Sequence, residues 1–343
     1  MKAVILVGGE GTRLRPLTET TPKPLLPFMN RPFLAHVLDH LAAHGVEEAI
    51  CSSPYLESVF HAFLESRRDR PPAVRWITEE QPLGTAGAVG GARAHLDDTF
   101  LVLNGDILTD LDLGALIRSH RDRGAVATIT LIEVKDARPF GLVEMDRDGR
   151  VVAFREKPAE PVAGTVNAGT YVLEPAALRA IPSGTAVSIE RETFPSLIAG
   201  GSNVQGFVGR GYWRDLGTPA AYLQGHFDAL DGLVDVFRDV SRPFLAGDAR
   251  VDPEATVGER VVCGEEVVVA AGSRVDRSVL HARAAVGPRA VVEGSILGRD
   301  SRVGAAAVLR DAVLGDGAEV EAGATVEDTR VGPGEHVAVR APT

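Results

Sequence analysis

An aliphatic or thiol side chain returns every six positions beyond residue 246. The first five members of the series are Val251, Val257, Cys263, Val269 and Val275. Leucine or valine then recurs every 17 residues, at Leu280, Leu297, Leu314 and Val331. Val286, Val303, Val320 and Val337 follow six residues later, and Val292, Leu309 and Val326 six later again. A fixed period of this kind constrains the fold more strongly than any other feature of the chain.

The steps of six, six and five residues predict three short strands per coil, each sending one side chain inward. Stacked coils of this shape form a triangular parallel β-helix with one shared core. The alternative is an irregular tail rich in Gly, Ala and Val, but chance does not hold a phase over four successive coils. The pattern breaks at Thr343, which we expect to be a polar cap. The repeat resembles the hexapeptide left-handed β-helix, and that resemblance supplies the handedness.

The region before residue 235 alternates apolar runs with amphipathic segments. Strands are predicted at residues 2–7, 99–104, 127–132 and 170–173, and a helix is predicted over Pro32–His44. This alternation is typical of an α/β fold, a Rossmann-like and mostly parallel sheet covered by helices. A chain of 343 residues is also longer than one core usually supports. We therefore expect a catalytic domain over residues 1–235 and a β-helix domain over residues 246–343.

Composition narrows the classes of partner. A formal net charge of −11 argues against general nucleic-acid binding, which needs a basic face. The sequence has no apolar run of 18 residues and no signal-peptide pattern at its start, so we expect a cytoplasmic protein with no membrane partner. Cys51 and Cys263 are far apart in sequence and are expected to be buried thiols.

A glycine-rich segment follows the first predicted strand. It reads Gly8-Gly9-Glu10-Gly11-Thr12-Arg13-Leu14-Arg15-Pro16-Leu17-Thr18 and continues to Thr21-Pro22-Lys23-Pro24. Glycines let backbone N–H groups approach phosphate oxygens, and Arg13 and Lys23 would neutralise their charge. A dinucleotide fingerprint fits poorly, because Leu14 replaces the third small residue and residues 49–52 lack the ribose-binding acid. A Walker loop also fails, because no Gly-Lys-Ser/Thr follows.

This segment matches the opening motif of the sugar-nucleotide pyrophosphorylases, G-G-x-G-T-R-L-x-P-L-T…P-K-P, and the resemblance extends over residues 1–230. The family condenses a nucleoside triphosphate with a sugar 1-phosphate, giving an NDP-sugar and pyrophosphate. The resemblance implies that Arg13 is the main catalytic cation and that Lys23 contacts the nucleotide phosphates. The implied nucleotide-binding set is Leu6, Gly8, Gly9, Gly11, Thr12, Arg13, Lys23, Gln81, Gly84 and Thr85. Glu79 and Glu80 compete with Gln81 as the base-reading residue.

Two aspartates are candidates for a divalent cation. Asp106 follows the apolar strand 100–104, and Asp215 lies among aromatic and glycine residues in 211–217. Either could be a turn-capping aspartate, but both segments resemble those that supply the family's metal ligands. Mg²⁺ takes few protein carboxylates and completes its shell with phosphate oxygens and water. We therefore expect Asp106 and Asp215 to hold Mg²⁺.

Two further segments, 154–158 and 166–171, resemble the family's sugar-binding regions. By that resemblance Glu156 and Asn167 hold the sugar, Lys157 holds its phosphate, and Gly141 lets the chain pass close. Without the resemblance, Glu156 and Lys157 would be an ordinary solvated charge pair. The implied catalytic set is Arg13, Lys23, Asp106 and Lys157.

The substrate pair follows from finer resemblance. The segment Val187–Pro195, the form Asn104-Gly105-Asp106 and the appended β-helix look most like mannose-1-phosphate guanylyltransferases, which favours GTP and mannose 1-phosphate. Glucose 1-phosphate with dTTP or UTP is the nearest alternative. A specialised sugar or cyclitol phosphate is another.

Two other classes of function stay open. A hexapeptide β-helix can carry acyl transfer, but His281 and His336 are isolated in the sequence. A catalytically silent regulatory subunit could keep the fold, yet all the charged candidates are retained. We expect the β-helix to serve self-association, because its flat sides repeat the same surface, and we expect a homo-oligomer.

Overall fold

The computed structural model describes residues 1–53, 57–138, 140–156, 160 and 162–339. The chain divides into two compact units that do not follow sequence order. The first unit comprises Met1–Gly9 and His36–Trp213, and the second comprises Glu10–Ala35 and Arg214–Thr343. Most of the glycine-rich segment therefore belongs to the same unit as the β-helix.

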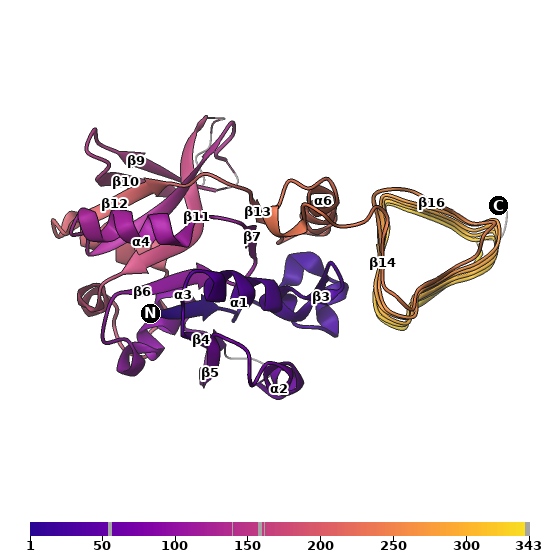
Figure 1. The fold of residues 1–343 in the computed structure, drawn as a ribbon, viewed down its shortest axis with the longest axis horizontal. Coiled ribbons are helices and arrows are strands. Elements are labelled where there is room, and N and C mark those ends of the chain that lie inside the picture. Colours follow the sequence, from indigo (N-terminus) through magenta and orange to yellow (C-terminus); the bar gives the residue numbers. More distant parts are fainter. Residues whose placement is uncertain (54–56, 139, 157–159, 161, 340–343) are drawn as a thin grey trace. The chain divides into compact units, whose positions relative to one another are not determined.

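The first unit is built on a nine-stranded mixed sheet (Figure 1). Its strands are β1 (Lys2–Leu6), β4 (Glu48–Ser53), β5 (Ala73–Thr78), β6 (Phe100–Asn104), β8 (Ala127–Val134), β9 (Gly141–Met145), β10 (Val151–Glu156), β11 (Gly164–Leu173) and β12 (Val204–Val208). The order is β10-β9-β11-β6-β1-β4-β5, and β8 joins β11 to β12. Neighbours from β6 to β5 are parallel, whereas β11 is antiparallel to β6, β8 and β9.

Helices connect these strands. They are α1 (Phe33–Ala43), which continues from the second unit, α2 (Glu57–Ser66), α3 (Gly84–Gly91), α4 (Leu113–Asp122) and α5 (Phe194–Ala199). Short helical turns add η4 (Arg93–His95), η5 (Pro175–Ala180) and η6 (Ile189–Thr193). Buried side chains from strands and helices, among them Phe100, Tyr171 and Phe194, form one apolar core. The predicted α/β class, strands and first helix are confirmed.

One predicted strand was too short. The sequence predicted residues 170–173, but β11 begins at Gly164. The cause is a register shift between Asn167 and Tyr171, where Gly169 adopts a φ of +73°. A glycine and an asparagine inside a strand read as a break, although here they mark a bulge that bends a continuous strand.

The second unit joins the glycine-rich segment to the C-terminal repeat. Its first part contains η1 (Thr12–Leu14), η2 (Leu17–Glu19), η3 (Lys23–Leu25) and the hairpin β2 (Pro27–Phe28) to β3 (Arg31–Pro32). After β13 (Trp213–Asp215), which spans the boundary between units, come α6 (Pro219–Leu230) and η7 (Asp235–Phe237). The Phe28 ring contacts the rings of Tyr222, His226 and Phe237, so the hairpin packs on α6.

The C-terminal repeat forms three parallel sheets that make a triangular prism when seen end-on (Figure 1). The first sheet contains β14 (Phe244–Leu245), β17 (Val261–Cys263), β20 (Ser278–Leu280), β23 (Ile296–Leu297), β26 (Val313–Leu314) and β29 (Arg330–Val331). The second contains β15 (Arg250–Val251), β18 (Val268–Val269), β21 (Ala285–Val286), β24 (Arg302–Val303), β27 (Glu319–Val320) and β30 (His336–Val337). The third contains β16 (Thr256–Val257), β19 (Arg274–Asp276), β22 (Val291–Glu293), β25 (Val308–Arg310) and β28 (Thr325–Glu327).

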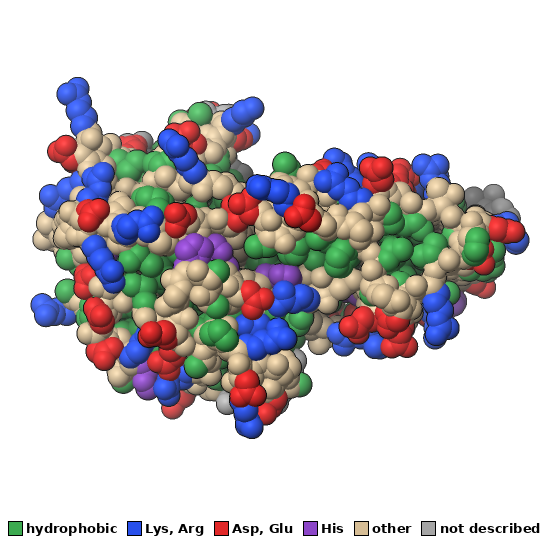
Figure 2. Space-filling model, in the orientation of Figure 1, with side chains coloured by type: hydrophobic (Ala, Val, Ile, Leu, Met, Phe, Trp, Pro, Cys, Tyr) green, Lys and Arg blue, Asp and Glu red, His purple; other side chains and the backbone are tan. Residues whose placement is uncertain are grey.

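The predicted repeat phase is confirmed, because the periodic aliphatic residues lie in the core of the prism together with smaller residues such as Ala284 and Ala307, and the architecture is consistent with a left-handed β-helix. The five-residue step turns its corner at residues with positive φ, among them Arg277, Gly294, Asp311 and Asp328. On the third sheet, the side chain of Arg310 pairs with those of Glu293 and Glu327. Acidic and basic side chains are interspersed over the face of the molecule that Figure 2 shows. Thr343 lies outside the described residues.

Cys51 and Cys263 are both buried and unbridged, as predicted. Burial raises the pKa of each thiol to about 12, which keeps both sulfurs protonated and unreactive at neutral pH. Among the helices that the structure describes, none has the length and apolar character needed to cross a bilayer.

Candidate functional site

The carboxyl ends of β1 and β6 bring two predicted motifs together in the first unit. Leu6 pairs with Asn104 across the parallel strands, and the Gly105 N–H donates to the Leu6 carbonyl at 3.0 Å. Gly105 has no room for a side chain, because a Cβ would lie 2.8 Å from that carbonyl oxygen. Asp106 therefore lies next to the end of β1, from which the chain continues to Gly8 and Gly9. This is the edge at which parallel sheets bind ligands.

The bulge of β11 meets the same edge. A Cβ on Gly169 would lie 2.7 Å from the Asn104 side-chain nitrogen, so only glycine fits there. The Asn167 Oδ1 accepts a hydrogen bond from the Gly169 N–H at 3.0 Å, which fixes the bulge. The predicted sugar residue Asn167 is thereby held close to the strand end that precedes Asp106.

Two other predicted sugar residues lie on the adjoining strands. Gly141 and Glu156 are directly opposite each other in the β9–β10 pair, and Val166 of β11 pairs with Leu142 of β9. Gly141, Glu156 and Asn167 thus occupy three neighbouring strands. The predicted phosphate ligand Lys157 lies outside the described residues.

A partly buried hydrogen-bond chain joins the sugar segment to the nucleotide segment. The Asn167 Nδ2 donates to the Tyr171 hydroxyl at 2.7 Å, and that hydroxyl donates to the Glu190 Oε1 at 3.3 Å. The Thr85 hydroxyl donates to the Glu190 Oε2 at 2.9 Å and accepts from the Ile189 N–H at 2.8 Å. Sequence reasoning missed Tyr171 and Glu190, although both lie inside motifs that it singled out. The available signal was the position of Tyr171 within a predicted strand, whereas Glu190 lies among other charged residues and carries no such signal.

The base-reading segment separates three candidate side chains. Glu79 is buried, accepting from the Ser52 hydroxyl at 2.8 Å and from the Leu83 N–H at 3.1 Å. It therefore has a structural role, whereas Glu80 and Gln81 are exposed. Gly84 begins α3 with a φ of +68° and lies against the Val187 carbonyl, which a Cβ would approach to 2.7 Å.

The glycine-rich loop is a compact helical turn in the second unit. Gly11 has a φ of +64°, and its carbonyl accepts from the Leu14 N–H at 2.9 Å and from the Thr18 hydroxyl at 2.8 Å. Leu14 and Leu17 anchor the turn because both are buried. Thr12 and Arg13 are left exposed, and Lys23 is half-buried at the start of η3.

Arg13 and Asp215 meet in the second unit. The Arg13 Nη2 lies 3.8 Å from the Asp215 Oδ2, with 65% of the Arg13 side chain exposed. Gly217 lies beneath the pair, because a Cβ there would come within 2.5 Å of the Arg13 Nη2 and 2.7 Å of the Asp215 Oδ1. The motif Asp215-Leu216-Gly217 therefore positions the predicted catalytic cation next to one predicted metal ligand.

The donor set suits a hard cation. Asp106 and Asp215 offer carboxylate oxygens, which Mg²⁺ prefers. The Asn104 Oδ1, beside Asp106, is buried and accepts no hydrogen bond among the described residues. A buried acceptor without a donor is costly unless a ligand or ion completes it. Within the described part of the chain, no cluster of three or more His, Cys, Asp or Glu side chains forms a metal site.

The histidines considered for acyl transfer have other surroundings. His281 is buried, its Nε2 lies 3.1 Å from the Tyr222 hydroxyl, and desolvation lowers its pKa to about 4. His336 is exposed on β30, in the last described coil. His281 directly follows β20 of the first sheet, whereas His336 belongs to the second sheet, and His281 is an internal packing residue.

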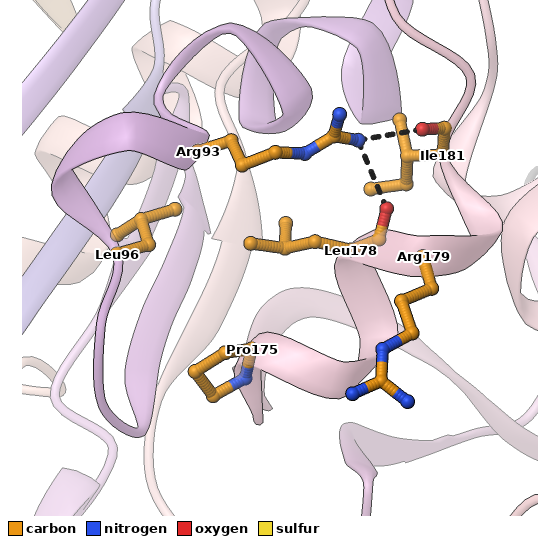
Figure 3. Close-up of a pocket in the computed structure, with 6 residues that line it drawn as sticks. All are labelled: Arg93, Leu96, Pro175, Leu178, Arg179 and Ile181. Carbon is orange, nitrogen blue, oxygen red and sulfur yellow. Dashed lines mark hydrogen bonds between the residues drawn. The ribbon is translucent and has the colours of Figure 1, made fainter.

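A cavity of about 350 Å³ lies elsewhere in the first unit (Figure 3). Its lining residues are Arg93, Leu96, Pro175, Leu178, Arg179 and Ile181. The Arg93 guanidinium donates to the Leu178 and Ile181 carbonyls at 3.0 and 2.7 Å and also to the Ser183 hydroxyl. Arg93, on η4, therefore ties η4 to η5. None of the predicted site residues lines this cavity.

Comparison with known proteins gives the class. Residues 2–232 match the model of the nucleotidyl transferase family, and residues 241–342 match the GMPPB C-terminal domain. The chain belongs to the nucleotidyl transferase family, as the sequence predicted.

Its relatives carry a more particular name. The chain is 41% identical over 283 residues to the mannose-1-phosphate guanylyltransferase of Mycobacterium tuberculosis, covering 81% of this chain and 79% of that protein. It is 37% identical over 294 residues to mannose-1-phosphate guanylyltransferase 1 of Arabidopsis thaliana, covering 83% and 81%. Among solved structures, HddC from Yersinia pseudotuberculosis complexed with GMP-PN is similar, with 31% identity, a TM-score of 0.56, and coverage of 65% of this chain and 96% of that one.

Proposed function

We propose that the chain transfers a guanylyl group from GTP to mannose 1-phosphate, forming GDP-mannose and releasing pyrophosphate. The observation that carries the reaction is the convergence of Leu6, Asp106 and Asn167 at one edge of the sheet. The relatives named as mannose-1-phosphate guanylyltransferases support the choice of substrates. The HddC complex with GMP-PN also supports a guanine nucleotide.

In the proposed reaction, a phosphate oxygen of the sugar 1-phosphate attacks the α-phosphorus of GTP. The bond from the α-phosphorus to the bridging oxygen breaks, and pyrophosphate leaves with the electron pair. The attacking phosphate is already ionised at neutral pH, so catalysis rests on positioning and charge stabilisation without a strong base.

The proposed roles follow the family resemblance, and the pairing of Arg13 with Asp215 supports them. Arg13 stabilises charge on the transferring phosphates, while the backbone of Gly8, Gly9 and Gly11 approaches them closely. Asp106 and Asp215 would hold Mg²⁺, which neutralises phosphate charge when bound. Gly141, Glu156 and Asn167 bind the sugar, and Lys157 binds its phosphate. Lys23 contacts the nucleotide phosphates.

The base is read by the remaining nucleotide residues. We assign Gln81 and Gly84 to the base edge, because Glu79 is committed to Ser52 and Leu83. Thr85 acts indirectly in this proposal, by orienting Glu190.

The test is pyrophosphate release across a matrix of GTP, ATP, UTP and dTTP with mannose 1-phosphate and glucose 1-phosphate, in the presence of Mg²⁺. GTP with mannose 1-phosphate should give the highest kcat/KM. Faster turnover of glucose 1-phosphate with dTTP or UTP would replace the substrates and keep the chemistry. No release with any pair, despite nucleotide binding, would indicate a silent subunit.

We also propose that copies of the chain associate through the β-helix. Its second and third sheets present exposed outward side chains, including Val268, which is 40% exposed. Light scattering should show an oligomer, and Val268→Glu should lower its mass. An unchanged mass would place the interface elsewhere.

A further inference from the structure

One side of the β-helix differs from the other two. On the first sheet, the residue before each inward aliphatic side chain points outward. In four successive coils these residues are Val262, Val279, Ile296 and Val313, each at most 7% exposed. The outward residues on the other sheets include Arg250, Arg274, Arg302, Glu319 and Thr325, which are exposed. An apolar row on one outer face indicates a surface built to be covered.

The second unit's own N-terminal part and α6 lie on this face. The Asn30 Nδ2 donates to the Cys263 carbonyl at 2.7 Å. The hydroxyl of Tyr222, on α6, lies 3.1 Å from the His281 Nε2 and also donates to the Pro27 carbonyl. α6 packs on β20 of the same sheet. The first sheet is therefore a seat for residues 10–35, which include the glycine-rich loop.

Arg330 ends the apolar row at the loop itself. It pairs with Val313 in register, so it occupies the next outward position of the row. Its Nη1 donates to the carbonyl oxygens of Arg13 at 3.2 Å and Arg15 at 3.1 Å. Arg13 and Arg15 lie on either side of Leu14, the last residue of η1. One guanidinium nitrogen therefore holds the backbone on both sides of Leu14.

A second bond from the β-helix reaches the same segment. The Thr20 hydroxyl donates to the Asp316 Oδ2 at 2.8 Å. The other oxygen of Asp316 accepts from the Arg299 N–H at 2.8 Å, which ties the carboxylate to the prism backbone. The loop is thus held from two neighbouring coils near the end of the repeat.

We propose that Arg330 is a positioning residue for nucleotidyl transfer and that the first sheet of the β-helix holds the catalytic loop in its reactive geometry. By fixing the carbonyls of Arg13 and Arg15, Arg330 sets the direction from which the Arg13 guanidinium reaches the phosphates. A loop fixed before the nucleotide arrives loses less entropy on binding and keeps the cation aligned. The inference depends on the proposed role of Arg13, and it gives the β-helix a task within one chain.

The first test is Arg330→Gln in the full chain, with GTP and mannose 1-phosphate. We expect kcat to fall about tenfold, since small misplacements of catalytic groups cost that much or more. The KM for mannose 1-phosphate should change less than twofold, because Asn167 and Gly141 belong to the other unit. Arg330→Lys should recover part of the loss, because an ammonium can donate to a carbonyl. Arg302→Gln is the matched control, an exposed arginine on the second sheet.

The deciding readout is a double-mutant cycle with Arg13→Ala. If Arg330 acts through Arg13, adding Arg330→Gln to Arg13→Ala should cost less than a further twofold in kcat. A full tenfold loss in the Arg13→Ala background would overturn the inference. So would an Arg330→Gln enzyme with wild-type kcat.

Thr20→Val tests whether a loss of activity is caused by a loss of stability. It removes the second bond without touching Arg330, and we expect a smaller fall in kcat at an unchanged Tm. A fall in Tm that accounts for the lost activity of both variants would also overturn the inference. An inactive wild-type chain would instead contradict the proposed function, so the two failures are distinguishable.

Discussion

The nucleotide loop and the sugar-side strand are held in place by different kinds of structure. Asn167, the proposed sugar residue, lies in a sheet and is fixed by a partly buried network through Tyr171 and Glu190. The loop around Arg13 is a short helical turn with an exposed surface, and Arg330, more than three hundred positions later, holds its carbonyls.

Asn167 is held by residues of its own sheet, whereas the loop around Arg13 is held by a residue far away in the sequence. Sheet register fixes the sugar side through continuous backbone bonding, so disturbing it disturbs the core. The loop depends on docking, so single side-chain changes can misalign it while the fold survives. Variants on the two sides should therefore produce different kinetic signatures.

The largest effect is expected from Arg13→Ala. Loss of one electrostatic stabiliser of the transferring phosphates should lower kcat by about two to three orders of magnitude, with Tm almost unchanged because the side chain is mostly exposed. Asp106→Asn should act similarly. Pyrophosphate release measures both, and Arg121→Ala on the exposed end of α4 is the control. Near-normal turnover of Arg13→Ala would remove it from the mechanism.

Gly217→Ala tests whether turnover depends on the spacing of Arg13 and Asp215. The added methyl would collide with the Arg13 Nη2 and the Asp215 Oδ1, which must both move. We expect kcat to fall about thirtyfold, within the range seen for small displacements of catalytic groups. Gly247→Ala is the matched control, because its Cβ meets nothing within 4 Å. Equal kinetics of the two variants would show that the spacing of Arg13 and Asp215 is unimportant.

Tyr171→Phe addresses the sugar side. Removing the hydroxyl takes away the acceptor of the Asn167 Nδ2 and the donor to the Glu190 Oε1, while the Glu190 Oε2 keeps its bond from Thr85, and this loss should destabilise the fold by about 1–3 kcal/mol. The KM for mannose 1-phosphate should rise about fivefold, whereas the KM for GTP should stay constant. Tyr222→Phe, at a second tyrosine that is fully buried, should leave the sugar KM unchanged. A rise in the KM values of both substrates in the Tyr171→Phe variant would show that the network through Tyr171 does not act on the sugar side alone.

The smallest effect concerns acid stability of the second unit. Burial lowers the pKa of His281 to about 4 from about 6.5, so the unfolded chain binds more protons between these values and stability falls as pH falls. The loss should be about 1 kcal/mol at pH 5.5. His281→Gln should flatten this part of the profile of Tm against pH, with His336→Gln as control. An unchanged slope would show that another group dominates, such as His40, whose pKa desolvation also lowers to about 4.

The sequence predicted what depends on local spacing. The inward positions of the β-helix follow from a fixed period, so Leu280, Leu297 and Leu314 were placed correctly in one core. The phosphate loop was recognised from a long irregular motif, and the strand that precedes Asp106 from its apolar run.

The sequence could not predict contacts that depend on how distant segments meet. Nothing local connects Arg330 with the carbonyls of Arg13, although the run Val262, Val279, Ile296 and Val313 was a readable sign of a covered face. The Glu79 carboxylate could not be separated from Gln81 until its bonds to Ser52 and Leu83 were visible.

In the proposed reaction, the loop at Gly11–Arg13 binds the triphosphate. A crystal structure of the full chain with Mg²⁺ and a non-hydrolysable GTP analogue tests it most directly. We expect phosphate oxygens within hydrogen-bond distance of the backbone N–H groups of this loop and of the Arg13 guanidinium, with Mg²⁺ on Asp106 and Asp215. A triphosphate bound away from Arg13, with the metal on other side chains, would contradict it.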